Sequence, residues 1–342
     1  MTMTGLINSA TKETKASREE HLLQDNDNRF VIFPLQYREI YQFYKKAEAM
    51  IWSDDEIDLS HDPLHWKKIT PDEQVFLKHI FAFFAASDGI VMENLAIRFF
   101  TGVQIPEVRA FYAHQLFIEN VHSITYSKII DSIIQDPQEQ RRLFNAVQTM
   151  PAVAKKAEWA LKWISSDSSF ATRLVAFAIV EGVFFSGSFS AIFWLRNRYR
   201  GLMPGIIQAN ELIMRDEGLH QAFAVYLYNH LIVEKLPRDF IHSIISEAVE
   251  VEVAFMSDAL PKRLLGMNIE LMVDHIQYVA NRLAKQLGYD EVYPGVKQPF
   301  EFMTNMSITT VTDFFGPSKE TQYNIGDKYM GVPLELQDTD EF

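Results

Sequence analysis

The sequence predicts an all-α protein, with one large helical domain between two loose ends. From residue 30 to residue 255, apolar side chains recur mostly at spacings of three and four, which is typical of helices that bury one face. No Asn-Gly or Asp-Gly hairpin turn lies between alternating runs, so strand signals are few. Proline and glycine are widely spaced through the middle of the chain, which leaves room for helices of roughly 20 to 30 residues.

Composition limits the classes of function. The 342 residues are 48% hydrophobic and include 26 phenylalanines, enough for a large core. The chain has no cysteine, which excludes disulfides, thiolate metal sites and a catalytic thiol. A net charge of −13 argues against direct nucleic-acid binding, because phosphate contacts depend on Lys and Arg. The N-terminus lacks the apolar stretch of a signal peptide, so we expect a cytoplasmic protein.

Three segments follow from these patterns. Residues 1–28 are polar and mixed in charge, and they predict a flexible N-terminal segment. Residues 29–315 carry the helical pattern and predict one domain. Residues 316–342 mix Gly, Pro and acids without periodicity, and they predict a flexible C-terminal tail.

The first long helix has a clear start signal. Residues 69–100 open with Thr70-Pro71-Asp72-Glu73, which offers an N-cap, a proline in the first turn and early acids that suit the helix dipole. Further along this helix, Asp88 is an isolated acid in the apolar run FAFFAASDGIVM.

Two short segments match each other and carry the main chemical signal. Residues 117–126 contain Glu119-x-x-His122, and residues 214–223 contain Glu217-x-x-His220. Residues three apart on a helix share a face, so each pair points a carboxylate and an imidazole in one direction. One such pair often arises by chance, whereas two in one chain predict a shared metal site.

The stretch before the second pair, residues 174–195, is apolar except for Glu181 and is long enough to span a bilayer. Asp88 precedes the first Glu-x-x-His pair much as Glu181 precedes the second, so the chain contains two copies of one unit, a helix with an isolated acid followed by a helix with Glu-x-x-His. Four helices would then offer four carboxylates and two imidazoles to one interior point, which resembles the ligand set of ferritin-like di-iron and di-manganese bundles. We therefore interpret residues 174–195 as a core helix rather than a membrane span.

Charge favours the same grouping. Four ionised carboxylates in an apolar core are unfavourable unless cations neutralise them, and two divalent ions would do so. Carboxylate and imidazole ligands without thiolate suit iron or manganese better than structural zinc. The remaining histidines fit no second cluster, and we interpret the acids Glu247, Glu250 and Glu252 as structural or solvated.

A tyrosine lies on the face of the first pair. Tyr126 is four residues after His122, within reach of a metal bound there. Phe185, Phe189 and Ile213 are placed to line the metal-facing surface with apolar groups. A dry pocket of this kind would protect a tyrosyl radical from quenching.

The motifs IENVHSITYS, RLVAFAIVEGVFFSGSF and RGLMPGIIQANELIMRDEGLH, in this order, resemble the small, radical-generating subunit of class I ribonucleotide reductase. The resemblance implies a ferritin-like bundle, two iron ions per chain (or manganese) and a homodimer. It implies as metal ligands Asp88, Glu119 and His122 for one ion and Glu181, Glu217 and His220 for the other. It also implies a radical on Tyr126, an electron relay at Trp52, and Asp216 as the link between that indole and His122.

The tail shows a looser resemblance. In this family a tail tyrosine relays the radical and the terminus docks on the large subunit, and both Tyr323 and Tyr329 match in part. The acidic ending LQDTDEF resembles the docking tails. The implied reaction is reduction of ribonucleotides to deoxyribonucleotides for DNA replication, with the substrate and thiols on the large subunit.

Other functions remain open from the residues alone. A ferritin-like iron-storage protein would form a large shell instead of a dimer, and it would have no need of the Trp52–Asp216 pair or the tail. A di-iron oxygenase would use the same ligands without an oxidisable tyrosine at position 126. A purely structural bundle would bind no metal.

Overall fold

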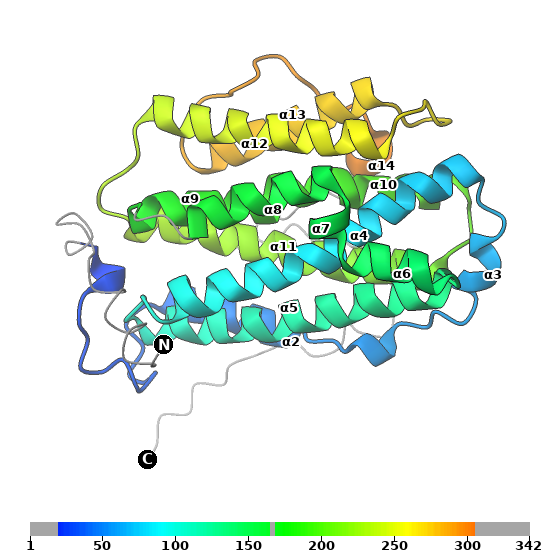
Figure 1. The fold of residues 1–342 in the computed structure, drawn as a ribbon. Coiled ribbons are helices and arrows are strands. Elements are labelled where there is room, and N and C mark those ends of the chain that lie inside the picture. Colours follow the sequence, from blue (N-terminus) through cyan, green and yellow to red (C-terminus); the bar gives the residue numbers. More distant parts are fainter. Residues whose placement is uncertain (1–19, 165–167, 305–342) are drawn as a thin grey trace.

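The computed structural model describes residues 20–164 and 168–304, which form a bundle of helices (Figure 1). Within these two ranges there is no β-strand, so the all-α prediction is confirmed. The boundary predicted at 28/29 remains a prediction, and the boundary at 315/316 lies outside the described residues.

The helices divide into long ones and short connectors. The long helices are α2 (Arg38–Ala49), α4 (Pro71–Asn94), α5 (Pro106–Ile133), α8 (Pro151–Ile164), α9 (Phe170–Ile179), α10 (Phe185–Arg198), α11 (Pro204–Leu231), α12 (Arg238–Ala259) and α13 (Ile269–Gln286). The short ones are η3 (His21–Leu23), η4 (Asp54–Glu56), α3 (Asp62–Trp66), α6 (Pro137–Phe144), α7 (Ala146–Thr149) and α14 (Glu301–Thr304). Two π-helical segments, η5 (Leu95–Phe100) and η6 (Val180–Phe184), continue α4 and α9.

The start of α4 is the one that the sequence predicts. Thr70 is the N-cap, and its hydroxyl accepts a hydrogen bond from the backbone N–H of Glu73 at 3.4 Å. In return, the Glu73 carboxylate accepts a hydrogen bond from the backbone N–H of Thr70 at 3.0 Å. This capping box satisfies N–H groups that the helix ladder leaves free, and it fixes where α4 begins.

Four helical rods surround the interior of the bundle: α4, α5, α11 and the continuous rod α9–η6–α10. α4 packs on α5, α5 on α11, α11 on α10, and α10 back on α4. α2 covers α5 on one side, while α12 and α13 pack against η6 and α10 on the other, as Figure 1 shows. A side chain that points inward from any of the four rods therefore meets side chains from the other three.

The most apolar helix is a core helix. α9, η6 and α10 form one continuous rod, Phe170–Arg198, and 94% of its most hydrophobic stretch of 18 residues is buried within the protein. Pro71–Phe100 is also long and apolar, and 56% of its most hydrophobic stretch of 18 residues is buried. The interpretation of residues 174–195 as protein core is thus confirmed.

Candidate metal centre

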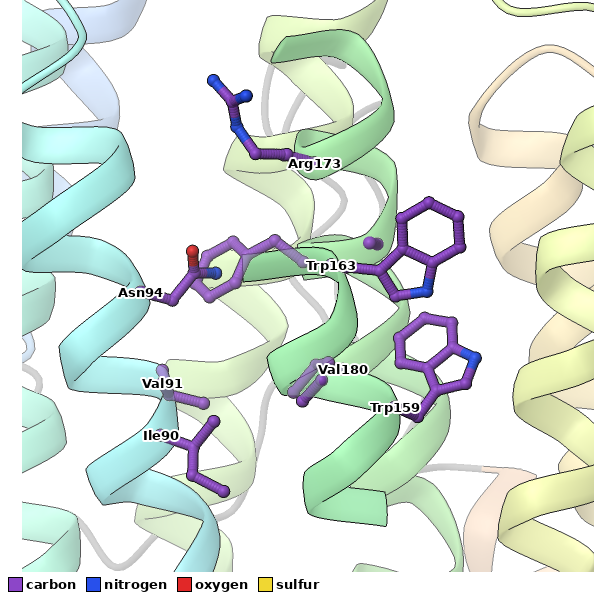
Figure 2. A pocket seen from close by; sticks show the side chains of 10 residues that line it. Ile90, Val91, Asn94, Trp159, Trp163, Arg173 and Val180 are labelled. Carbon is purple, nitrogen blue, oxygen red and sulfur yellow. The ribbon is translucent and has the colours of Figure 1, made fainter. Parts of the chain in front are cut away.

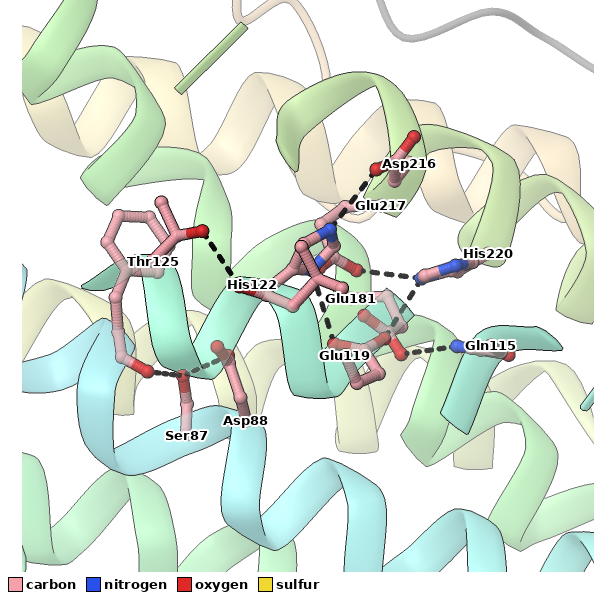
Figure 3. Close-up of polar contacts among 12 residues, drawn as sticks. Ser87, Asp88, Gln115, Glu119, His122, Thr125, Glu181, Asp216, Glu217 and His220 are labelled. Atoms are coloured by element: carbon pink, nitrogen blue, oxygen red, sulfur yellow. Dashed lines mark hydrogen bonds and ion pairs between the residues drawn. The ribbon is translucent and has the colours of Figure 1, made fainter. Parts of the chain in front are cut away.

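The four inner rods bring the six predicted ligands to one buried place (Figure 3). α4 carries one acid, η6 another, and α5 and α11 each carry one Glu-x-x-His pair. Each of the six side chains is exposed by 2% or less: Asp88, Glu119, His122, Glu181, Glu217 and His220. The spacing of three residues within each pair explains why its carboxylate and imidazole point to the same side.

Two glutamates lie between the two imidazole rings. The Nδ1 atom of His122 lies 3.4 Å from Oε2 of Glu119 and 3.0 Å from Oε1 of Glu217. The Nδ1 atom of His220 lies 3.0 Å from Oε1 of Glu119 and 3.1 Å from Oε2 of Glu217. Each glutamate therefore directs one oxygen toward each histidine, an arrangement in which a carboxylate can bridge two cations.

The other two acids complete the cluster and keep free oxygens. The Ser87 hydroxyl donates to Oδ1 of Asp88 at 3.3 Å, and the Gln115 amide donates to Oε1 of Glu181 at 3.0 Å. Within the described part of the chain, Oδ2 of Asp88 and Oε2 of Glu181 are buried and accept no hydrogen bond. Buried polar atoms without partners are unfavourable, so these oxygens are suited to hold a ligand of opposite charge.

Burial and the charges of neighbouring side chains shift the pKa values of the cluster residues. Burial, and then the charge of Glu119, raises the pKa of Asp88 well above its usual range. Burial, and then the charge of Glu217, does the same to the pKa of Glu181. Burial alone would lower the pKa of His220, but the carboxylates of Glu119 and Glu217 outweigh it and raise this pKa to about 9. The cluster therefore favours cations, whether protons or metal ions.

The donor set fits a metal. Ligand atoms of Glu119, Glu181, Glu217 and His220 all lie within 4.8 Å of one another, and Asp88 and His122 adjoin them. Carboxylate oxygens and imidazole nitrogens without thiolate are the ligands of iron and manganese sites. Four acids for two imidazoles match two divalent ions better than one. The site is thus able to hold a dinuclear metal centre.

Glu181 comes from an irregular turn that the sequence did not predict. η6 has π-helical spacing, in which the helix widens by one residue, and such turns are frequent at functional sites. Gly182 follows Glu181, and a Cβ there would lie 1.5 Å from Nε2 of Gln221 on α11. A side chain at position 182 would displace the Gln221 amide, so glycine is the residue that lets this amide of α11 pack against the backbone next to Glu181.

Tyr126 lies in an apolar pocket on the same side of α5 as His122. Its side chain is 1% exposed, and within the described residues its hydroxyl has no hydrogen-bond partner. The ring of Phe84 stacks on it, with centroids 4.4 Å apart and planes 4° apart. Phe185 and Phe189, which we expected to line the pocket, contact the ring of Phe84. Burial, and then the charge of Asp88, raises the pKa of Tyr126 well above its ordinary value.

A chain of contacts runs from His122 toward the surface. The Trp52 indole donates to Oδ2 of Asp216 at 2.7 Å, and the same oxygen lies 3.2 Å from Nε2 of His122. Arg215 donates to the other oxygen of Asp216 at 3.0 Å and to the carbonyl of Met50 at 2.7 Å. Arg215 therefore ties the segment before Trp52 to the carboxylate that Trp52 contacts.

Three contributing residues were missed by sequence reasoning, although the sequence carries a signal for each. Phe84 is four residues before Asp88 and Gln115 is four before Glu119, so each shares a helix face with a predicted ligand. Arg215 is adjacent to Asp216 in the chain. By contrast, Tyr323 and Tyr329 lie outside the described residues.

The cluster is separate from an apolar cavity nearby in the bundle. That cavity lies between α4, α8 and α9, and it is lined mostly by apolar side chains such as Val91, Trp159 and Val180 (Figure 2). Asn94 and Arg173 are its polar lining residues. It offers no carboxylate or imidazole for a metal, so the chemistry is expected at the buried cluster.

Comparisons with known proteins agree on one family. The family described as ribonucleotide reductase, small chain, matches residues 29–299. A ribonucleoside-diphosphate reductase small chain from Trypanosoma brucei brucei is 55% identical over 309 residues, covering 89% of this chain and 91% of the relative. A ribonucleoside-diphosphate reductase subunit M2 from Danio rerio is 53% identical over 301 residues, covering 88% of this chain and 77% of the relative.

The fold agrees as well. A solved structure of a ribonucleotide reductase homodimer from Saccharomyces cerevisiae superposes with a TM-score of 0.77 at 36% identity, covering 88% of this chain and 96% of that one. These matches confirm the resemblance that the motifs indicated.

Proposed function

The chain belongs to the family of ribonucleotide reductase small chains, and from this premise we propose that it is the subunit that generates and stores a tyrosyl radical for ribonucleoside-diphosphate reductase. The observation that carries the proposal is Tyr126, an oxidisable side chain that is buried close enough to the cluster to be affected by the charges of Asp88, Glu217 and Glu119. The family match favours this function over iron storage or direct oxygenation of a small molecule.

The cluster residues would hold two iron ions, or manganese. The bound metal would supply one-electron oxidising power, with O2 as the terminal electron acceptor. The Tyr126 hydroxyl would give one electron to that oxidant and one proton toward the cluster carboxylates, of which Asp88 acts most strongly on it, and the Phe84 ring stacked on Tyr126 would keep water from the radical. Glu119 and Glu217, which each face both histidines, would be among the residues that hold the ions, while Gln115 would orient Glu181.

The oxidising equivalent would leave through Trp52. Oδ2 of Asp216 holds the indole N–H and adjoins His122, so it couples the indole to the cluster through one carboxylate. A tail tyrosine, Tyr323 or Tyr329, would continue the path to the large subunit, whose thiols would reduce the ribonucleotide. In this proposal the tail 316–342 docks on that subunit.

Metal binding is expected to be measurable without turnover. Metal-free protein should bind two Mn(II) ions per chain, and the ions should raise its unfolding temperature. Binding only to the native state adds about 2.7 kcal/mol to stability when the free ion is at roughly 100 times its Kd. Glu119→Gln removes a charge that faces both histidines, and it should abolish binding of at least one ion.

The matched control for this measurement is Glu250→Gln, which changes an exposed acid of α12 and should bind both ions normally. Calorimetric titration and thermal unfolding give the two readouts. Full binding of two ions by Glu119→Gln would contradict the assignment of this residue.

One face of α5 fits a homodimer. Ala113, Phe117, Asn120 and Ile124 are exposed at spacings of four, three and four, which places them on one stripe of the helix. Phe117 is 51% exposed and Ile124 38% exposed, so the stripe offers apolar surface to water. In the proposed dimer a second copy of the chain covers this stripe.

Phe117→Glu is expected to convert the dimer to monomer. A charge at the centre of an apolar interface should weaken association by roughly 30-fold or more. Sedimentation velocity measures the change. Val233→Glu is the control, because Val233 is 58% exposed but lies in the segment between α11 and α12, outside the α5 stripe, and this variant should remain dimeric. A dimeric Phe117→Glu protein would place the interface elsewhere.

A further inference from the structure

A lysine is buried in the core outside the metal cluster. Lys156 of α8 is 1% exposed, and its ammonium lies 2.5 Å from Oε2 of Glu252 on α12, which is fully buried. Burial lowers the pKa of Lys156 to about 8 and raises that of Glu252 to about 7, so both charges lack the stabilisation that water would give. Replacing a buried ion pair with apolar side chains is often neutral or stabilising, so stability alone does not account for this one.

The ammonium has a second partner in the helix that carries Glu181. Nζ of Lys156 donates to the backbone carbonyl of Phe184 at 2.7 Å. Phe184 is the last residue of η6, and α10 begins at the next residue. Phe184 is the N-cap of α10, so its carbonyl stands at the start of the α10 hydrogen-bond ladder, and the ammonium donates to it at the point where π spacing returns to α spacing.

Aromatic rings and the backbone of α10 pack closely around the Lys156–Glu252 pair. The ammonium lies 3.2 Å from the centroid of the Phe83 ring and 4.2 Å from that of Phe255. On the far side of the pair, a Cβ at Gly187 would lie 2.7 Å from Oε1 of Glu252. The Glu252 carboxylate thus packs directly against the backbone of α10, and the pair contacts this rod at Phe184 and at Gly187, three residues apart on one face.

We propose that Lys156 is a positioning residue whose ammonium, held by Glu252, fixes the π-helical turn Val180–Phe184 and with it the place of the Glu181 carboxylate. The inference rests on the proposed function, because it assigns Lys156 an effect on one metal ion of the cluster. A pair that only joined α8 to α12 would have no need of the Phe184 carbonyl. The surface pair Lys162–Glu247 joins the same two helices at 2.8 Å, and within the described ranges neither side chain has a hydrogen bond or ion pair with η6.

The test is a Mn(II) titration of the full chain, in which paramagnetic resonance of the free aqueous ion reports unbound metal. The paired variant Lys156→Met with Glu252→Met removes both charges and the donor to Phe184, and it should still unfold cooperatively. One of its two Mn(II) ions should bind about 10- to 100-fold more weakly than in the wild type, because groups that orient a ligand contribute that much to affinity. The other ion should bind as before.

Two controls separate positioning from general weakening. Lys162→Met with Glu247→Met, the matched pair on the same helices, should bind both ions as the wild type does. Glu252→Gln keeps the Lys156 amine, whose N–H groups can donate to Phe184 in the charged or the neutral form, so its two affinities should stay within about threefold of the wild type, below the loss expected for a disturbed ligand-orienting group. Each control applies even if the paired variant does not fold.

The outcomes are distinguishable. Wild-type protein that binds no Mn(II) would overturn the proposed function itself. Wild-type binding of two ions together with unchanged affinities in a folded Lys156→Met, Glu252→Met protein would overturn only the role of Lys156. Equal weakening in Glu252→Gln or in the surface pair would also overturn it, because neither change removes the donor to Phe184.

Discussion

Tyr126→Phe is expected to abolish the radical signal and to reduce turnover with the large subunit by about 1,000-fold or more, while two metal ions still bind. The substitution removes one oxygen, and within the described residues that oxygen has no hydrogen-bond partner to lose. A phenylalanine ring would keep the stacking on Phe84 at 4.4 Å. The loss would therefore come from chemistry, since a phenyl ring has no hydroxyl to oxidise.

The matched control is Tyr112→Phe. Tyr112 lies on the same helix, is 1% exposed and also has a buried hydroxyl without a partner among the described residues. Its substitution should leave both the radical and turnover intact. Electron paramagnetic resonance after reconstitution with Fe(II) and O2 gives the first readout, and deoxyribonucleotide formation gives the second. A radical that survives in Tyr126→Phe, or that is lost in Tyr112→Phe, would move the radical to another side chain.

Local periodicity accounts for what could be predicted of the cluster. The two Glu-x-x-His pairs and the two isolated acids could be grouped because helical spacing fixes which side chains share a face. The same rule, applied four residues upstream, would have identified Phe84 and Gln115 as well. The start of α4 could be predicted because a capping box is contained within four adjacent residues.

Features that depend on contacts between distant segments could not be predicted. The sequence Val-Glu-Gly-Val-Phe at 180–184 is compatible with an ordinary α-helix, and nothing local indicates its π spacing. The partners of that turn come from elsewhere, since Lys156 precedes Phe184 by 28 residues. Glu252 was interpreted from sequence as structural or solvated, and its burial became visible only when α12 was packed against α8 and α10.

Trp52→Phe is expected to separate radical formation from radical use. The variant should form the Tyr126 radical, because the six cluster side chains and the Phe84 ring are unchanged. Turnover with the large subunit should fall by about 1,000-fold or more, since a phenyl ring is far harder to oxidise than an indole and cannot donate to Asp216. The same protein sample would thus give a strong paramagnetic resonance signal and almost no deoxyribonucleotide.

The control for loss of an indole hydrogen bond is Trp194→Phe. Trp194 is 2% exposed, and its indole donates to the carbonyl of Leu265 at 2.9 Å, so its substitution loses comparable packing and one comparable bond. It does not contact the cluster, and turnover should persist. Normal turnover in Trp52→Phe would show that the oxidising equivalent leaves by another route. The Trp52 ring also stacks near His122, with ring centroids 5.9 Å apart. Loss of the Tyr126 signal in Trp52→Phe would therefore show that Trp52 is needed to form the radical rather than to transfer it.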